Sequence, residues 1–137
     1  MRPVNLFLTE DGVLKLGYYG LTTQVECYSI KKMDCEGLRS FAPEVFEGEY
    51  EMKSDVWSLG IVLMELMGIW PYYWRDNDDL PTKNGDLSLP FDEDDIESEE
   101  LLDFLKKCFQ RQNERCSVDE LLNVSVVRWR MMSSIHS

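Results

Sequence analysis

The sequence predicts a mainly α-helical domain with a short N-terminal β-hairpin, a long loop, one central buried helix and further packed helices. Three observations carry this prediction. The segment 54–68 is apolar on nearly every face, two later segments carry helical patterns, and an Asp-Gly turn separates two short apolar runs near the N-terminus. With 137 residues and 44% hydrophobic content, the chain suffices for one domain with a core and is short for two.

The first predicted element is a β-hairpin made of the runs "NLFL" and "VLKLGYYG". Asp-Gly in the connecting "TEDG" favours the positive φ angles of a tight turn. Residues 21–40 show no sustained periodicity and predict a long loop, which in a compact domain is typically functional. Its hydroxyl groups are candidates for phosphorylation, with plain solvated hydroxyls as the alternative: Thr22, Thr23, Tyr28, Ser29 and Ser40.

The central helix is predicted over 54–68, "SDVWSLGIVLMELMG". Ser54 and Asp55 at its start offer acceptors for unpaired backbone N–H groups, and Gly68 is typical of a helix end. A helix that is apolar all round belongs in the centre of a domain.

Two further helices follow. Over 99–110, apolar residues recur at the spacing of one amphipathic helix: Leu101, Leu102, Phe104, Leu105, Cys108 and Phe109. "SVDELL" predicts the start of another, because Ser117 and Glu120 match a capping box ahead of two leucines.

Composition excludes several classes of function. The net charge of −12 argues against nonspecific nucleic-acid binding, which needs lysine and arginine to neutralise phosphates. No apolar run approaches the roughly 20 residues of a membrane span, and no secretory signal is recognisable. Four cysteines without a CxxC pair and a single histidine leave little material for a zinc site. We therefore expect reduced thiols and a cytoplasmic location.

Much of the negative charge is local. Residues 76–100 contain eleven acidic side chains against the single Lys83, so this stretch alone contributes about −10. Such a run is usually a solvated loop, and the alternative is a docking surface for a basic partner.

Several motifs resemble those of protein kinases. "FAPEVFEGEYEMKSDVWSLGIVLMEL" is similar to the stretch from "APE", at the end of the activation segment, through the "DxWSxG" start of the central helix. "LLDFLKKCFQRQNERCSVDELL" is similar to "CLxxDPxxRPSxxELL", with Cys116 where proline is usual. Upstream, "RPVN" resembles "KPxN" and "VLKLGYYG" resembles "VKLxDFG". The resemblance is to serine/threonine kinases of the sterile-twenty or MAP kinase kinase type. It implies that 1–137 is one partial kinase domain, the C-terminal lobe from the tail of the catalytic loop onward.

This resemblance assigns site positions residue by residue. Arg2 falls on the catalytic-loop lysine and Asn5 on the asparagine that holds the second magnesium ion. Tyr18, Tyr19 and Gly20 fall on "DFG". The base of the family would lie one position before Met1, and the N-lobe with its glycine-rich loop would precede it.

The departures from the kinase pattern predict lost chemistry. Tyr18 replaces the aspartate that holds the metal bridging the terminal phosphates, and a neutral phenol is a poor magnesium ligand. Asn5 is the single remaining metal candidate. We therefore expect no cofactor for this chain, although the family uses ATP and magnesium.

The scaffold positions are retained. The resemblance implies that Glu44 and Arg115 form a buried ion pair tying the activation segment to a C-terminal helix, and that Asp55 accepts hydrogen bonds from the catalytic-loop backbone. We expect the charged groups of Glu44 and Arg115 to lie within hydrogen-bonding distance. The alternative is that both are surface residues.

The function predicted from these observations is that of a kinase-like C-lobe fragment, catalytically inactive and acting in signalling through protein partners or a peptide substrate, with no nucleic acid and no membrane involved. One alternative is a truncated part of a serine/threonine kinase that transfers the ATP γ-phosphate to protein hydroxyls once the missing N-lobe is supplied. A third is an adaptor whose acidic stretch captures basic peptides. Such a fragment is also expected to expose apolar hairpin residues and to associate: Leu6, Leu8, Val13, Leu14 and Tyr18.

Overall fold

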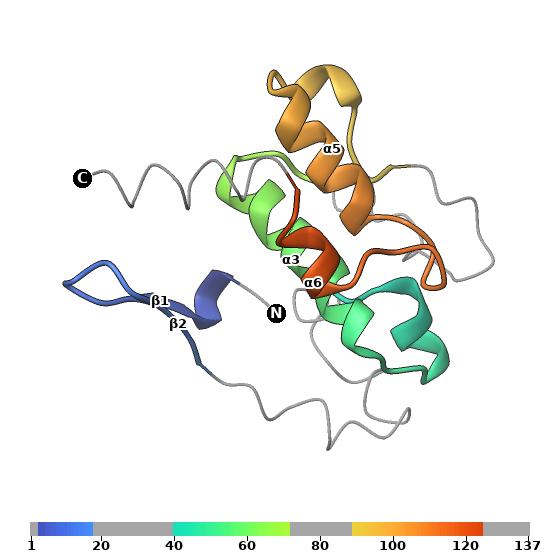
Figure 1. The fold of residues 1–137 in the computed structure, drawn as a ribbon, viewed down its shortest axis with the longest axis horizontal. Coiled ribbons are helices and arrows are strands. Elements are labelled where there is room, and N and C mark those ends of the chain that lie inside the picture. Colours follow the sequence, from blue (N-terminus) through green and yellow to red (C-terminus); the bar gives the residue numbers. More distant parts are fainter. Residues whose placement is uncertain (1–2, 18–39, 72–88, 125–137) are drawn as a thin grey trace.

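A computed structural model describes residues 3–17, 40–71 and 89–124 of the chain (Figure 1). The described part is helix-rich with one short two-stranded sheet. In chain order its elements are η1 (Pro3–Asn5), β1 (Leu6–Leu8), β2 (Leu14–Leu16), η2 (Pro43–Glu47), α3 (Met52–Leu66), η3 (Glu93–Asp95), α5 (Glu99–Cys108) and α6 (Val118–Leu121). The predicted combination of a hairpin, a central helix and further helices is therefore confirmed for these residues. The long loop over 21–40 lies outside them, apart from Ser40.

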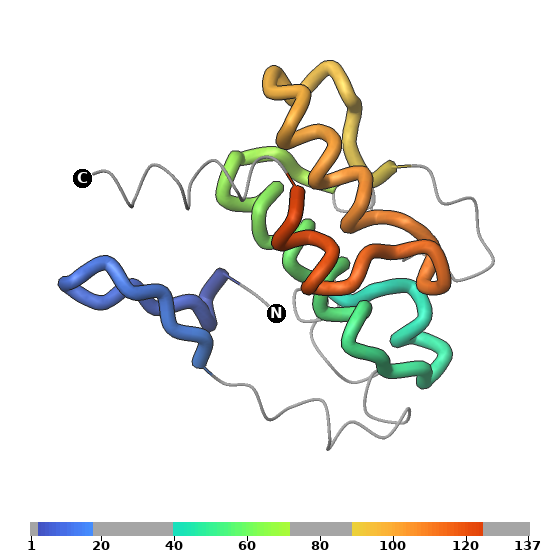
Figure 2. Tube along the Cα trace, in the orientation of Figure 1, coloured from blue at the N-terminus to red at the C-terminus, as the bar shows by residue number. Residues whose placement is uncertain are grey.

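Helix α3 runs through the middle of the helical body, with α5 and α6 packed around it (Figures 1 and 2). Its core-facing side chains include Trp57, whose ring meets the edge of Phe109 at a centroid distance of 5.0 Å. The core joins apolar residues from all three helices, from η2 and from the segments before, between and after them: Ala42, Val45, Val56, Trp57, Ile61, Met64, Phe91, Ile96, Phe104, Leu105, Cys108, Phe109, Leu121 and Val124. The predicted helix is thus present and buries residues between Ser54 and Met64, whereas Leu66 near its C-terminal end is 68% exposed.

A glycine on α3 allows the close approach of α5. A Cβ atom at Gly60 would lie 2.7 Å from Cζ of Phe109 and 2.9 Å from Cβ of Cys108. Real Cβ atoms do not approach so closely, so the packing of these two helices depends on the absence of a side chain at position 60.

The predicted ends of the central helix were wrong by two residues. Helix α3 begins at Met52, not at Ser54, because Glu51 is its N-cap and forms a capping box with Ser54 at the third helical position. The last helical residue is Leu66, followed by Met67 as the C-cap and by Gly68 with φ +75°. Gly68 thus follows the helix end in the left-handed conformation that glycine favours.

The later helices agree more closely with their patterns. Helix α5 begins at Glu99 as predicted and ends at Cys108, two residues short of the predicted Gln110. Ser98 caps it by accepting a hydrogen bond from the Leu101 N–H at 3.3 Å. Helix α6 starts after Ser117, and the capping box of Ser117 with Glu120 is formed as predicted.

The hairpin at the N-terminus is antiparallel and shorter than its two sequence runs. Leu6 pairs with Leu16 and Leu8 with Leu14, so these four leucines share one face. A 3-10 turn, η1, precedes the first strand and was not predicted; it lies against α3. The turn closes with a hydrogen bond from the Gly12 N–H to the Thr9 carbonyl at 2.9 Å, and Gly12 has φ +81°.

Most of the hairpin is exposed. Leu8 is 71%, Leu14 63% and Val13 49% exposed, as predicted for these three residues, whereas Leu6 is half-buried. Tyr18 lies outside the described residues. The association expected from this surface stays a prediction.

Within the described ranges, no helix is both long and apolar enough to cross a membrane.

Candidate functional site

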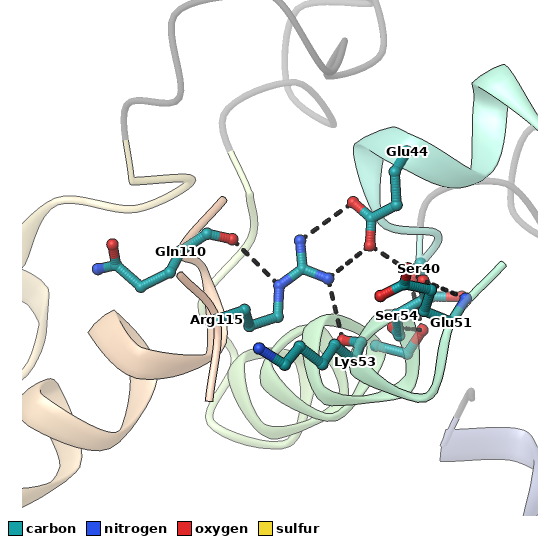
Figure 3. Close-up of polar contacts among 8 residues, drawn as sticks. Ser40, Glu44, Glu51, Lys53, Ser54, Gln110 and Arg115 are labelled. Carbon is teal, nitrogen blue, oxygen red and sulfur yellow. Dashed lines mark hydrogen bonds and ion pairs between the residues drawn. The ribbon is translucent and has the colours of Figure 1, made fainter. Parts of the chain in front are cut away.

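The charged groups of Glu44 and Arg115 form a bidentate ion pair in the core (Figure 3). Nη1 of Arg115 lies 2.6 Å from Oε1 of Glu44, and Nη2 lies 3.1 Å from Oε2. The two side chains are only 1% and 2% exposed. The expected contact is therefore present, and the alternative of two surface residues does not hold.

Local structure explains how Glu44 reaches this position. Pro43 occupies the first position of η2, where a missing N–H costs nothing. The turn ends at Gly48, which has φ +87° and donates its N–H to the carbonyls of Glu44 and Val45. These two features fix a short turn on the surface of α3, and the Glu44 side chain points from it toward Arg115 (Figure 3).

Arg115 joins three segments of the chain. Its Nε donates to the Gln110 carbonyl at 3.1 Å, and Nη1 also donates to the Lys53 carbonyl at 2.9 Å. The guanidinium carbon lies 5.1 Å from the centre of the Trp57 ring, within the range of a cation–π contact. Arg115 thus ties the end of α5 and the start of α3 to η2.

The carboxylate of Glu44 has one further partner. Burial acts to raise the pKa of Glu44, but hydrogen bonds from Arg115 and from its own backbone, the Arg115 charge and the Ser54 hydroxyl together lower it below its usual value. Oγ of Ser54 donates to Oε1 of Glu44 at 2.9 Å. Glu44 is therefore held as a carboxylate inside the protein.

Sequence reasoning missed the serines of this site. Ser54 was assigned as the helix cap, and Ser58 was given no role. In the structure Ser58 donates to the Ser40 carbonyl at 2.7 Å. The available signal was the pair of serines one turn apart on an otherwise apolar helix, since buried hydroxyl groups need hydrogen-bond partners.

Asp55 is not part of this cluster. It lies in the first turn of α3, where a carboxylate complements the positive helix end, and its side chain is exposed. The resemblance assigns the catalytic-loop backbone, the predicted partner of Asp55, to Asn5 and the residues before it, and this contact stays a prediction.

Asn5 lies at the open end of the hairpin, in η1. Its backbone carbonyl accepts a hydrogen bond from the Gly17 N–H at 2.8 Å, and the residue is half-buried. Position 5 therefore lies opposite position 17, and Tyr18 is the next residue in the chain. Arg2, Tyr18, Tyr19 and Gly20 lie outside the described residues.

Metal-binding clusters are absent from the part of the chain that the structure covers: it contains no group of three or more histidine, cysteine, aspartate or glutamate side chains able to hold an ion.

The described part is thus a helical body that contains a buried carboxylate–guanidinium pair, with a hairpin at one end. Comparison with known families gives a match to the protein kinase domain over residues 1–127. The chain therefore belongs to the protein kinase domain family.

Three relatives that are described as protein kinases agree with this family assignment. The chain is 31% identical over 136 residues to the serine/threonine-protein kinase Nek9 of Xenopus laevis, covering 95% of this chain and 14% of the relative. It is 31% identical over 134 residues to the G2-specific protein kinase nim-1 of Neurospora crassa, covering 93% and 15%. It is 33% identical over 130 residues to the serine/threonine-protein kinase STE20 of Debaryomyces hansenii, covering 90% and 12%. The chain thus spans about one seventh of the length of the first of these relatives.

Proposed function

We propose that residues 1–137 act as the C-terminal lobe of a kinase-like protein that does not transfer phosphate and works by binding other proteins in cytoplasmic signalling. The kinase family is established by the match over residues 1–127. The loss of phosphoryl transfer and the binding role are our inference from the residues at the catalytic positions.

The end of the hairpin carries this proposal. In the family, two side chains hold magnesium. One is the asparagine of the catalytic loop, and the other is the aspartate of "DFG", which comes directly after a strand. The hydrogen bond between the Gly17 N–H and the Asn5 carbonyl, at 2.8 Å, supports the assignment of Asn5 and Tyr18 to these neighbouring positions. This assignment puts a tyrosine at the position where the family has its aspartate.

The donor set at this end does not fit magnesium. Mg²⁺ requires hard oxygen ligands, normally including one or two carboxylates. Here the side chains are the amide of Asn5 and the neutral phenol of Tyr18. We therefore derive no catalytic step through ATP and magnesium for this chain.

The retained scaffold supports a binding role. The buried pair of Glu44 and Arg115 links η2 to the start of α3 through the Lys53 carbonyl, and to the segment after α5 through the Gln110 carbonyl. In this assignment the chain keeps the ion pair that supports the peptide-facing loop. It lacks the aspartate that binds the metal, and with it the ability to transfer phosphate. Protein partners or a peptide are the ligands that such a surface would take.

A thermal-shift experiment tests the proposal. The chain is heated alone, with ATP and Mg²⁺, and with ATP and EDTA. A ligand at 100 times its Kd stabilises the folded state by about 2.7 kcal/mol, which is several degrees for a domain of this size. We expect no metal-dependent shift. A clear shift with Mg²⁺ that EDTA abolishes would overturn the proposal.

Substitution at position 18 sharpens this test. Tyr18→Asp restores the family's carboxylate and should produce or increase a magnesium-dependent shift if the assignment of position 18 is correct. Tyr19→Asp is the matched control, because it adds the same charge one residue away. Equal responses of the two variants would refute the assignment of the metal position.

The second candidate function is a part of an active serine/threonine kinase. The descriptions of its relatives as serine/threonine-protein kinases favour this candidate, as does Asn5 at the family's second metal position. Adding a kinase N-lobe with its catalytic loop in trans and following phosphate transfer to a protein substrate distinguishes it from the first. Incorporation that depends on this chain would favour the active form.

A further inference from the structure

A second contact holds the segment before η2 to α3, separately from the ion pair. Oγ of Ser58 donates to the carbonyl oxygen of Ser40 at 2.7 Å. It also lies 3.3 Å from the carbonyl oxygen of Ser54, one turn earlier in the same helix. Because a hydroxyl carries a single proton, the shorter contact to Ser40 is the principal one. Both Ser40 and Ser58 are buried, each 4% exposed.

The second acceptor lowers the free-energy cost of breaking the contact between Ser58 and Ser40. If the Ser40 carbonyl moves away, the Ser58 hydroxyl turns to the Ser54 carbonyl, the usual hydrogen bond of a serine inside a helix. Release of Ser40 therefore leaves no unpaired donor on Ser58. Release of Glu44 from Arg115 is different, because it leaves a buried charge without its partner.

The side chain of Ser40 opposes its own docking. Within the described part of the chain, the buried Oγ of Ser40 has no hydrogen-bond partner. A buried hydroxyl without a partner loses the hydrogen bonds that it makes in water, so its burial costs free energy. The hydrogen bond to the Ser40 carbonyl and the unpaired Ser40 hydroxyl thus have opposite effects on the same docked position.

We propose that Ser58 is a positioning residue that holds Ser40, at the end of the long loop, in a releasable contact, and that the Ser40 hydroxyl, which has no partner among the described residues, keeps this contact weak. The ion pair of Glu44 anchors the following turn, whereas the position of Ser40 is adjustable. The importance of this contact for partner binding rests on the proposed function, because this loop is the one expected to face a protein ligand. The contact itself does not depend on that function.

Hydrogen exchange measured by mass spectrometry on the full chain, without nucleotide, tests the proposal. Ser58→Ala removes the donor, and we expect the amides within 41–45, apart from Pro43, which has no N–H, to exchange about fivefold faster, the effect of losing a typical hydrogen bond. Ser40→Ala removes the unpaired hydroxyl and keeps the carbonyl. We expect exchange at the same amides to slow by a similar factor. The two changes thus have opposite effects at one place.

Amides of α5 report global opening and serve as the internal control. Ser58→Thr keeps the hydroxyl and should restore the slow exchange of 41–45; the Ser40→Ala arm adds no atoms and remains informative if threonine does not fit. No local change in Ser58→Ala, equal acceleration in α5, or faster exchange in Ser40→Ala would each overturn the proposal. Because no nucleotide or partner is present, these outcomes are independent of the thermal-shift result.

Discussion

Replacing Arg115 by methionine is the sharpest test of how this domain is held together. Arg115→Met keeps much of the side-chain volume and removes the charge, so the Glu44 carboxylate stays in the core with the Ser54 hydroxyl as its remaining side-chain donor. Removing one partner of a buried ion pair typically costs about 3–5 kcal/mol. Small domains have a total stability of about 5–15 kcal/mol, so the loss is a large share of it.

The structure also predicts an asymmetry between the two partners. In Glu44→Gln the guanidinium keeps the Gln110 and Lys53 carbonyls and the face of Trp57. We therefore expect Glu44→Gln to cost less than Arg115→Met, by about 1.5–3 kcal/mol, the value of hydrogen bonds to a charged group. The double variant should cost less than the sum of the single variants, because the two side chains are in contact.

Urea unfolding followed by circular dichroism measures these differences. A matched control is the pair of Lys106 and Glu93, which has the same 2.6 Å separation but is 38% and 50% exposed. Lys106→Ala should cost about 1 kcal/mol or less, as exposed ion pairs do. If Arg115→Met cost no more than Lys106→Ala, burial would not be what gives the Glu44 pair its strength, and the reasoning would be refuted.

Three further predictions concern the pH dependence, the helix contact and the buried thiol. Because the folded pKa of Glu44 lies below its unfolded value, its contribution is complete above about pH 4.5 and is lost as pH falls through the folded pKa, so Glu44→Gln should flatten the stability profile between pH 5 and 2 in urea titrations. Gly60→Ala should destabilise the fold by about 1–2 kcal/mol despite the better helix propensity of alanine, because the new methyl group would lie 2.7 Å from Phe109; equal or greater thermal stability would contradict this. Burial raises the pKa of the Cys108 thiol to about 12, so peptide mapping after iodoacetamide treatment at pH 8 should find it unmodified until urea unfolds the chain, and rapid labelling in the folded state would refute its burial.

Periodicity in the sequence was sufficient to locate α3 and α5. The apolar residues of 54–68 and the recurring pattern of 99–110 each led to a helix close to its observed position. The start of α3 was misplaced because the best capping residue type, Ser54, sits inside the helix. Its hydroxyl accepts the Glu51 N–H at 3.4 Å and donates to Glu44. Ser54 thus makes a tertiary contact with Glu44 from inside the helix, although its local preference is for the helix end.

The site was less accessible to sequence reasoning. No local pattern links Glu44 to a residue 71 positions later; their pairing was inferred from motif resemblance alone. The contact of Ser58 with the Ser40 backbone had no motif at all, since any residue supplies a carbonyl. Ser40 was a candidate for phosphorylation because it is a hydroxyl residue at the end of the predicted loop. The structure buries it to 4% exposure.

The long separation of the ion pair has a consequence for synthesis. Glu44 and the whole of α3 leave the ribosome before Arg115 is added, 71 residues after Glu44. At about 5–20 residues per second this interval lasts roughly 4 to 14 s. During that time the carboxylate has no guanidinium to neutralise it, so η2 gains little from docking on α3 and water remains its better environment. The nascent chain thus has to delay this packing until the segment that contains Arg115 has emerged.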